Sequence, residues 1–225
     1  LSASTVKNIP PASRGDLFFD FEGDPTYQEW DPQGRPVTDA GGDAAVRFGV
    51  EYLFGIWGDA VNPGADNPDF LALWADNFEE EKAVLEQFCA LVSTRREAHP
   101  DMRVYHYAAY ERTKLRQLRT RHNTAHDCVE RLLGELLVDL YPIVTKAVAV
   151  GLPRYGLKAL EAIYLPTGTR TGIAGGGESV VAFYRYQQLR AAADVTGAAE
   201  LKNSILGYNE IDCYSTKLLR DWLLA

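Results

Sequence analysis

The hydrophobic pattern along the chain predicts three strands in its first third. Residues 16–22 form an apolar, aromatic-rich run that is typical of a buried strand. Residues 23–43 are rich in Gly, Pro and Asp and predict a long irregular loop, either a functional flap or a disordered excursion. Residues 46–57 and 69–75 then predict two further strands, which would form an antiparallel meander with the first.

From residue 77 onward the pattern changes to helices that alternate with short strands. Asn77 and Glu80 have capping-box spacing and open a predicted helix that extends to about residue 96. Further short strands are expected at residues 102–107 and 136–142, and further helices at 110–121, 126–137, 143–150, 156–164, 178–193 and 198–224. This order predicts an α/β fold with a five-stranded mixed sheet, three antiparallel strands followed by two parallel ones, flanked by helices.

Composition indicates one soluble globular domain. The chain has 225 residues, 46% of them hydrophobic, and no apolar run of about 18 residues that would predict a membrane span. Residues 1–15 are polar and are expected to be a linker, with the domain over residues 16–225. Because there is no initiator Met and no signal-peptide pattern, we expect a domain excised from a longer protein. Three widely spaced cysteines argue against a disulfide framework and favour a reducing, cytoplasmic location.

The net charge of −8 lowers the expectation of a nucleic-acid partner, because Lys and Arg usually provide the phosphate contacts. Two stretches, residues 112–121 and 185–190, are basic although the chain as a whole is acidic. Each is interpreted either as a source of phosphate contacts or as a solvated helix face, and the second reading is the commoner one for a charge run.

Four carboxylates in three separated segments predict a metal site. Asp20 and Glu22 are two residues apart on a predicted strand and would point to the same side. Glu111 follows a short strand, and Asp212 lies one helical turn after Tyr208. Carboxylates suit Mg²⁺ or Mn²⁺, and two such ions about 4 Å apart can hydrolyse a phosphodiester. A free phenol is protonated at neutral pH, so Tyr208 is expected to orient the attacking water.

These residues resemble the DEDD 3′→5′ exonucleases, Tyr subclass, of the ribonuclease-H-like superfamily. The resemblance rests on Asp20-x-Glu22, on His106-x3-Tyr110-Glu111 and on Tyr208-x3-Asp212, in the family's order. It implies a ribonuclease-H-like fold and Mg²⁺- or Mn²⁺-dependent 3′→5′ exonuclease activity. Two positions depart from the family: His106 replaces the usual Asn, and Glu111 replaces the usual Asp.

A narrower resemblance covers roughly residues 14–224. The phrases DLFFDFEGDP, EYLFGIW, YHYAAYE, LVDLYP and YGLKALE are similar to the YprB-type ribonuclease-H-like module of predicted RecB-family nuclease and helicase proteins. It implies helicase and RecB-like nuclease domains in the same or a partner chain, and a role in DNA repair or recombination. It also implies that Asp139 and Lys158 lie near the substrate.

Several alternatives remain open at this point. The chain could be a catalytically weak nucleic-acid-binding module that positions DNA for attached domains, or its site could have endonuclease or ribonuclease specificity. The DNA ligand could be a single strand or a 3′ end, and RNA is a further possibility. His106 is interpreted as a structural hydrogen-bonding residue or a substrate contact, and Trp30 in the long loop as a candidate for base stacking.

Overall fold

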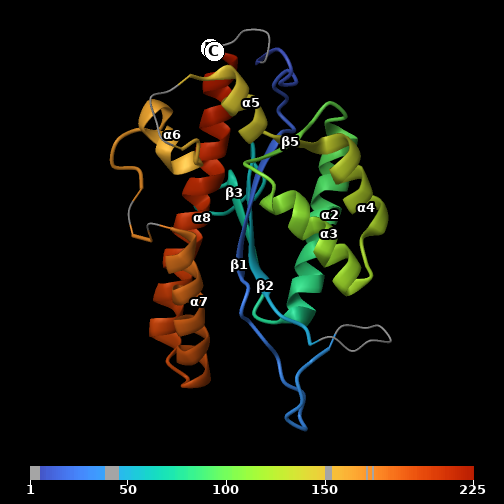
Figure 1. The fold of residues 1–225 in the computed structure, drawn as a ribbon, viewed down its shortest axis with the longest axis vertical. Helices are drawn as coiled ribbons and strands as arrows, with labels where there is room; N and C mark the ends of the chain where they lie inside the picture. Colours follow the sequence, from blue (N-terminus) through green and yellow to red (C-terminus); the bar gives the residue numbers. More distant parts are fainter. Residues whose placement is uncertain (1–5, 39–45, 150–153, 171, 174) are drawn as a thin grey trace.

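The apolar run at residues 16–22 forms β1 (Leu17–Asp24), the central strand of a five-stranded sheet (Figure 1). The computed structural model describes residues 6–38, 46–149, 154–170, 172–173 and 175–225. The other strands are β2 (Val50–Trp57), β3 (Phe70–Trp74), β4 (Val104–His106) and β5 (Leu137–Asp139). Their order is β3-β2-β1-β4-β5, with antiparallel pairing among β1, β2 and β3 and parallel pairing of β1, β4 and β5, as predicted.

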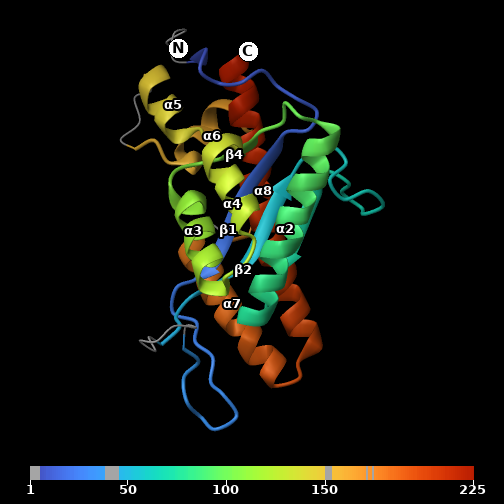
Figure 2. The same ribbon diagram turned by 90° about the vertical axis from the view of Figure 1, so that its right-hand side faces the viewer.

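Helices cover both faces of the sheet (Figures 1 and 2). One layer contains α2 (Phe78–Ala98), α3 (Tyr110–His122) and α4 (His126–Arg131). The other contains α6 (Leu157–Tyr164), α7 (Gly176–Ala191) and the long α8 (Val195–Leu224), while α5 (Tyr141–Ala147) packs against the end of α8. The sheet is therefore buried on both sides, which explains why β1 reads as a nearly continuous apolar run.

The side chains of β1 alternate between the two helix layers. Leu17, Phe19 and Phe21 join the core on the α2 side, where the Phe19 ring stacks on Phe88 with ring centroids 4.4 Å apart. Phe18 packs on the opposite side, in the cluster that includes residues of α8. Because the period of a strand is two, the even-numbered Asp20 and Glu22 also face α8.

Helix α2 begins as its sequence predicts. The Asn77 side chain accepts a hydrogen bond from the Glu80 backbone N–H at 2.9 Å. The Glu80 carboxylate accepts the Asp76 N–H at 2.7 Å, one residue earlier than in a standard capping box. These bonds satisfy the Glu80 N–H, one of the orphan donors at the helix start, and the Asp76 N–H just before the cap.

Several element boundaries differ from expectation, among them both short strands, which span Val104–His106 and Leu137–Asp139, and three of the other differences have a local cause. The strand expected from residue 46 begins at Val50, because Gly49 has a φ of 77°, a left-handed conformation that interrupts extended backbone. The helix expected over residues 126–137 ends at Arg131 and continues as one π-helical turn (Leu132–Leu136), which buries three leucines before β5 starts. The helix expected over residues 143–150 begins at Tyr141, since the first turn tolerates Pro142; residue 150 lies outside the described residues.

Two segments were expected to lack regular structure, the linker over residues 1–15 and the loop over residues 23–43. Their described residues differ in their contacts. Ile9, in the expected linker, is buried, and Arg95 of α2 donates to the Gly15 carbonyl at 2.8 Å. In the long loop, residues 25–38 contain only isolated bridges, and Trp30 is 61% exposed. The irregular character predicted for that loop is confirmed over these residues.

Two further observations concern membrane-spanning helices and the cysteines. Among the described residues no helix is both long enough and apolar enough to cross a membrane. The three cysteines are free thiols, which agrees with the absence of a disulfide framework in the sequence pattern.

Helix α8 approaches the sheet very closely at Gly55. Gly55 pairs with Asp20 across β1 and β2. A Cβ added to Gly55 would lie 1.6 Å from Asn209 Oδ1 and 3.0 Å from Cys213 Sγ, both on α8. Only glycine therefore permits this contact between the helix and the central strands.

We expect the substitution Gly55→Ala to lower the free energy of unfolding by roughly 1–3 kcal/mol, because the new methyl group must displace Asn209. Denaturant unfolding followed by circular dichroism measures this change. Gly134→Ala is the matched control, since a Cβ there meets no atom within 4 Å. Equal destabilisation by the two substitutions would contradict the close approach of α8.

Candidate metal centre

Three of the four predicted carboxylates meet between β1 and α8. Asp20, Glu22 and Asp212 each offer an oxygen, and these atoms lie within 4.8 Å of one another. The two-residue spacing on β1 directs the first two to the α8 face, and the middle of α8 contributes the third. Glu22 and Asp212 are buried, at 6% and 7% exposed.

The position of the cluster follows from how the sheet is paired. The last residue pair between β1 and β4 is Phe18 with Tyr105, so Asp20 and Glu22 lie beyond the end of that parallel ladder. In open α/β sheets, sites form at this carboxyl end of parallel strands. On the β2 side, the register shifts directly after Glu22, a bulge of the kind that is often found next to functional sites.

Burial raises the pKa of each carboxyl group in the cluster. The pKa of Asp20 is well above its ordinary value, mainly through burial and then through the charge of Asp212. Burial raises the pKa of Glu22 to about 8, against the opposing hydrogen bond from Ser179. Burial also raises the pKa of Asp212, although the positive charge of Arg170 partly offsets this. The cluster therefore tends to hold protons when no cation is bound.

Tyr208 and Lys158 lie beside the cluster. The Lys158 Nζ donates to the Tyr208 hydroxyl and lies 4.3 Å from the centroid of its ring. Burial and the charge of Asp212 hold the pKa of the Tyr208 phenol above its ordinary value. The phenol therefore remains protonated near neutral pH and can act as a hydrogen-bond donor.

Glu111 lies next to the three-carboxylate cluster. It lies close enough to Asp20 to help raise the pKa of that carboxyl group. Its Oε2 is also 3.1 Å from Nδ1 of His106, which is fully buried. His106 thus positions Glu111, and within the described chain its Nε2 has no hydrogen-bond partner.

The two other residues expected near the substrate have different surroundings. Lys158 lines a cleft of about 290 Å³ together with Asp20, Asp212 and Tyr107. Asp139 instead accepts hydrogen bonds from the backbone N–H groups of Ala108 and Tyr141, each at 2.9 Å. These bonds fix the turn after β4, where Ala108 has a φ of 73°.

The structure adds several residues that the sequence interpretation did not include. Asn209 Nδ2 donates to Asp20 Oδ2 at 2.8 Å, and Arg170 Nη2 donates to Asp212 Oδ1 at 2.5 Å. Arg170 also pairs with Glu161. Asn209 precedes Asp212 by three residues, a helical spacing that indicates a shared face. Arg170 lies in a Gly-rich loop, and no periodic pattern connects it with the cluster.

The donor set fits a hard divalent cation. All three clustered side chains are carboxylates, the ligands that Mg²⁺ and Mn²⁺ prefer over the thiolate and imidazole ligands typical of Zn²⁺. A bound cation would also reverse the electrostatic cost of placing these groups together. Asp20, Glu22 and Asp212 are the residues that would hold it.

Comparison with known proteins gives one match. A family model described as the RNase H superfamily matches residues 47–224, which is most of the chain. The match contains β2 to β5 and α8 with Asp212, whereas β1 with Asp20 and Glu22 precedes it. No curated protein and no solved structure matched the chain.

The pKa of Glu22 predicts how the metal-free protein responds to pH. Its folded-state pKa of about 8 exceeds the ordinary value of 4.5, so the folded protein retains a proton that the unfolded chain has lost between these values. The free energy of unfolding should therefore fall as pH rises from about 4.5 to about 8. We expect Glu22→Gln, which removes the charge at nearly constant shape, to reduce this fall.

Denaturant unfolding in EDTA across this pH range measures the effect. Addition of Mg²⁺ or Mn²⁺ should restore stability most strongly at the alkaline end, and less in Glu22→Gln than in the unsubstituted protein. Asp66→Asn, at an exposed loop position, is the control for a change in net charge. Parallel pH profiles for the Glu22 and Asp66 variants would contradict this assignment.

Proposed function

The chain belongs to the ribonuclease H superfamily, and we propose that it is a divalent-metal-dependent nuclease that removes nucleotides from the 3′ end of DNA. The observation that carries the proposal is the group of three carboxylates from β1 and α8 within 4.8 Å. When bound there, Mg²⁺ or Mn²⁺ would supply an activated water and stabilise the leaving oxygen.

The residues around the cluster support phosphodiester hydrolysis. The protonated phenol of Tyr208 can donate a hydrogen bond that orients a water or a phosphate oxygen. Lys158 lines the cleft that contains Asp20 and Asp212, and its ammonium group offers a positive charge to the scissile phosphate. His106 holds Glu111 next to Asp20, so the longer side chain of Glu111 is directed toward the reacting region.

The choice of a 3′ end and of DNA rests on the resemblance to the DEDD exonucleases. The cleft of about 290 Å³ is at the small end of ligand sites, which favours a terminal nucleotide over a continuous duplex. The YprB-type resemblance further supports a role in DNA repair or recombination, with helicase and RecB-like nuclease domains as partners.

One contact favours a second candidate function, a nucleic-acid-binding module with weak or no catalysis. Arg170 already neutralises Asp212, so a cation would compete with a guanidinium for this ligand. Calorimetric titration with Mn²⁺ separates the two functions. Tight metal binding that grows stronger in Arg170→Gln supports the nuclease, whereas DNA binding without metal binding supports the module.

We expect Asp20→Asn to lower metal-dependent cleavage of a 3′-labelled single strand by roughly a thousandfold or more, because it removes the central charge of the cluster. A gel assay with Mg²⁺ or Mn²⁺ measures the rate. The variant should remain folded in EDTA, since the loss of one buried charge relieves repulsion. Asp66→Asn should cleave at the original rate, and intact cleavage by Asp20→Asn would exclude this site.

Removal of the Tyr208 hydroxyl tests its orienting role. Tyr208→Phe should reduce kcat by roughly tenfold to a hundredfold while metal affinity is retained, because the phenol would act on water or phosphate. The control is Tyr164→Phe, which removes a hydroxyl that bonds Ser215 of α8. Similar losses of kcat in both variants would indicate a general packing effect instead.

A further inference from the structure

Helix α3 concentrates positive charge in an acidic chain. It carries five Arg or Lys residues and one acidic residue, whereas the whole chain has a net charge of −8. Two of the five face α4 and the chain after it: Arg112 donates to the Leu133 carbonyl at 2.6 Å, and Arg119 pairs with Glu130. Of the remaining three, Lys114 and Arg121 lie on the opposite side of the helix, paired with Glu51 and Glu81, and Arg116 is exposed to solvent.

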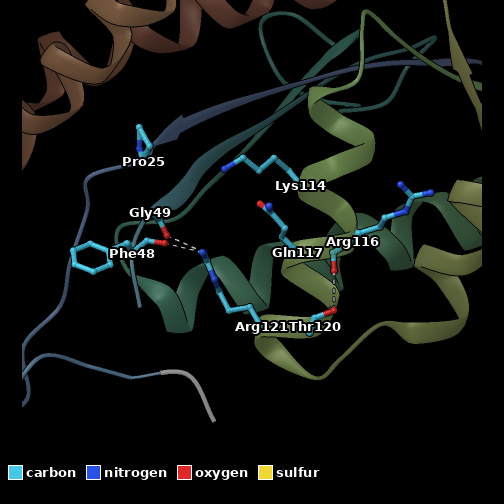
Figure 3. A pocket seen from close by; sticks show the side chains of 8 residues that line it. All are labelled: Pro25, Phe48, Gly49, Lys114, Arg116, Gln117, Thr120 and Arg121. Atoms are coloured by element: carbon cyan, nitrogen blue, oxygen red, sulfur yellow. Dashed lines mark hydrogen bonds between the residues drawn. The ribbon is translucent and has the colours of Figure 1, made fainter. Parts of the chain in front are cut away.

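A trough of about 620 Å³ lies between α3 and the chain that flanks the sheet. Lys114, Gln117 and Arg121 project from α3 toward the segment that contains Phe48 and Gly49 (Figure 3). None of the residues that line the trough is acidic. The exposed Arg116 extends the basic surface on the outer side of the helix.

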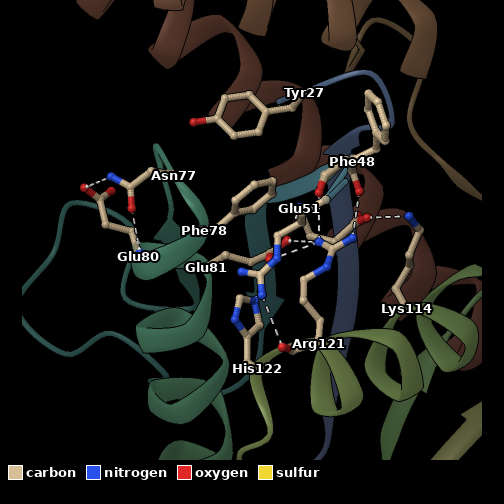
Figure 4. Close-up of polar contacts among 12 residues, drawn as sticks. Tyr27, Phe48, Glu51, Asn77, Phe78, Glu80, Glu81, Lys114, Arg121 and His122 are labelled. Carbon is tan, nitrogen blue, oxygen red and sulfur yellow. Dashed lines mark hydrogen bonds and ion pairs between the residues drawn. The ribbon is translucent and has the colours of Figure 1, made fainter. Parts of the chain in front are cut away.

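Buried carboxylates hold the cationic groups of the trough in place (Figure 4). Glu51, 2% exposed, accepts from Lys114 Nζ at 2.6 Å. Glu81, fully buried, accepts from Arg121 Nη1 at 3.1 Å and lies 2.6 Å from His122 Nε2. Because the carboxylates lie in the interior, a ligand in the trough would meet the exposed parts of Lys114 and Arg121, 21% and 17% of their side chains.

Arg121 also fixes the opposite wall. Its guanidinium donates to the carbonyls of Phe48 and Gly49, each at 2.8 Å. The backbone at Phe48 is thereby anchored, although the Phe48 ring is 55% exposed. An exposed aromatic ring on anchored backbone is the arrangement that stacks unpaired bases in single-strand-binding proteins.

One end of the trough lies near Glu111, the α3 residue beside the candidate metal centre. Glu111, which lies beside Asp20, precedes Lys114 by three residues, or about 5 Å along the helix. At the other end, Arg121 contacts Gly49, which lies against Pro25, the residue after β1. Helix α3 and strand β1 therefore run away from the centre in the same direction and form the two sides of one path.

We propose that this trough binds the sugar-phosphate backbone of a single-stranded polynucleotide whose end lies at the metal centre. This inference rests on the proposed function and adds the path of the substrate. Lys114 and Arg121 face the phosphates, Arg116 extends the positive field outward, and Phe48 stacks against a base. The trough has the volume of a small-ligand pocket, which suits a short stretch of single strand and not a duplex.

Gln117 allows a test that breaks no contact, because its side chain makes no hydrogen bond or ion pair within the described residues. Fluorescence anisotropy in EDTA measures the Kd of labelled oligo-dT and oligo-U without cleavage. We expect Gln117→Glu to weaken binding about threefold to tenfold and Gln117→Lys to strengthen it by a similar factor. Both effects should shrink at high salt.

The matched controls lie on α7, on the other face of the sheet. Gln188→Glu and Gln188→Lys change an exposed glutamine in the other basic stretch, residues 185–190, and should leave Kd unchanged because the proposal places the strand along α3. Phe48→Ala should weaken binding about fivefold or more, whereas Tyr184→Ala, with a ring that is 59% exposed, should not.

The outcomes separate this inference from the proposed function. Absence of oligonucleotide binding, or equal effects at positions 117 and 188, overturns the trough even if Asp20 proves essential for cleavage. A change in Kd confined to Gln117 and Phe48 supports the trough, and does so even in a protein that shows no metal-dependent cleavage. The difference between the oligo-dT and oligo-U values identifies which polymer the trough prefers.

Discussion

The close approach of α8 to the central strands at Gly55 is the constraint on which the candidate centre depends. Because Gly55 lacks a side chain, Asn209 reaches Asp20, and Asp212 comes within 4.8 Å of both β1 carboxylates. The same contact helps to bury Glu22 and Asp212, which are 6% and 7% exposed. Desolvation then raises the pKa of all three carboxyl groups, that of Glu22 to about 8. The packing of α8 on the sheet therefore sets both the positions and the pKa values of these carboxyl groups.

The surroundings offset this burial with different partners for each carboxylate. Asn209 donates to Asp20, Ser179 and Asn209 hold the pKa of Glu22 below what burial alone would give, and Arg170 pairs with Asp212. These side chains are the polar partners of the carboxylates when no metal is bound. A cation that binds to the carboxylates would therefore replace some of these partners. Arg170 is the partner that such an exchange affects most, since its guanidinium bonds directly to a would-be ligand.

Helix α3 connects the centre with the protein surface. Its first turn places Glu111 beside Asp20, and its last turn places Arg121 against the segment before β2. Between them the helix carries most of its basic residues on an otherwise acidic protein. The negative net charge therefore describes the chain as a whole, whereas a polyanion approaching the centre along α3 would meet a positive local surface.

Local periodicity in the sequence was enough to predict β1, the shared face of Asp20 and Glu22, the start of α2 and the one-turn spacing of Tyr208 and Asp212. Each of these depends on residues close together in the chain. Contacts between distant segments decided the rest: the pairing of Arg170 with Asp212, the bond between Asp139 and Ala108, and the place of Glu111 beside the cluster. No repeat or spacing encodes such contacts, because they arise only when packing brings separate elements together.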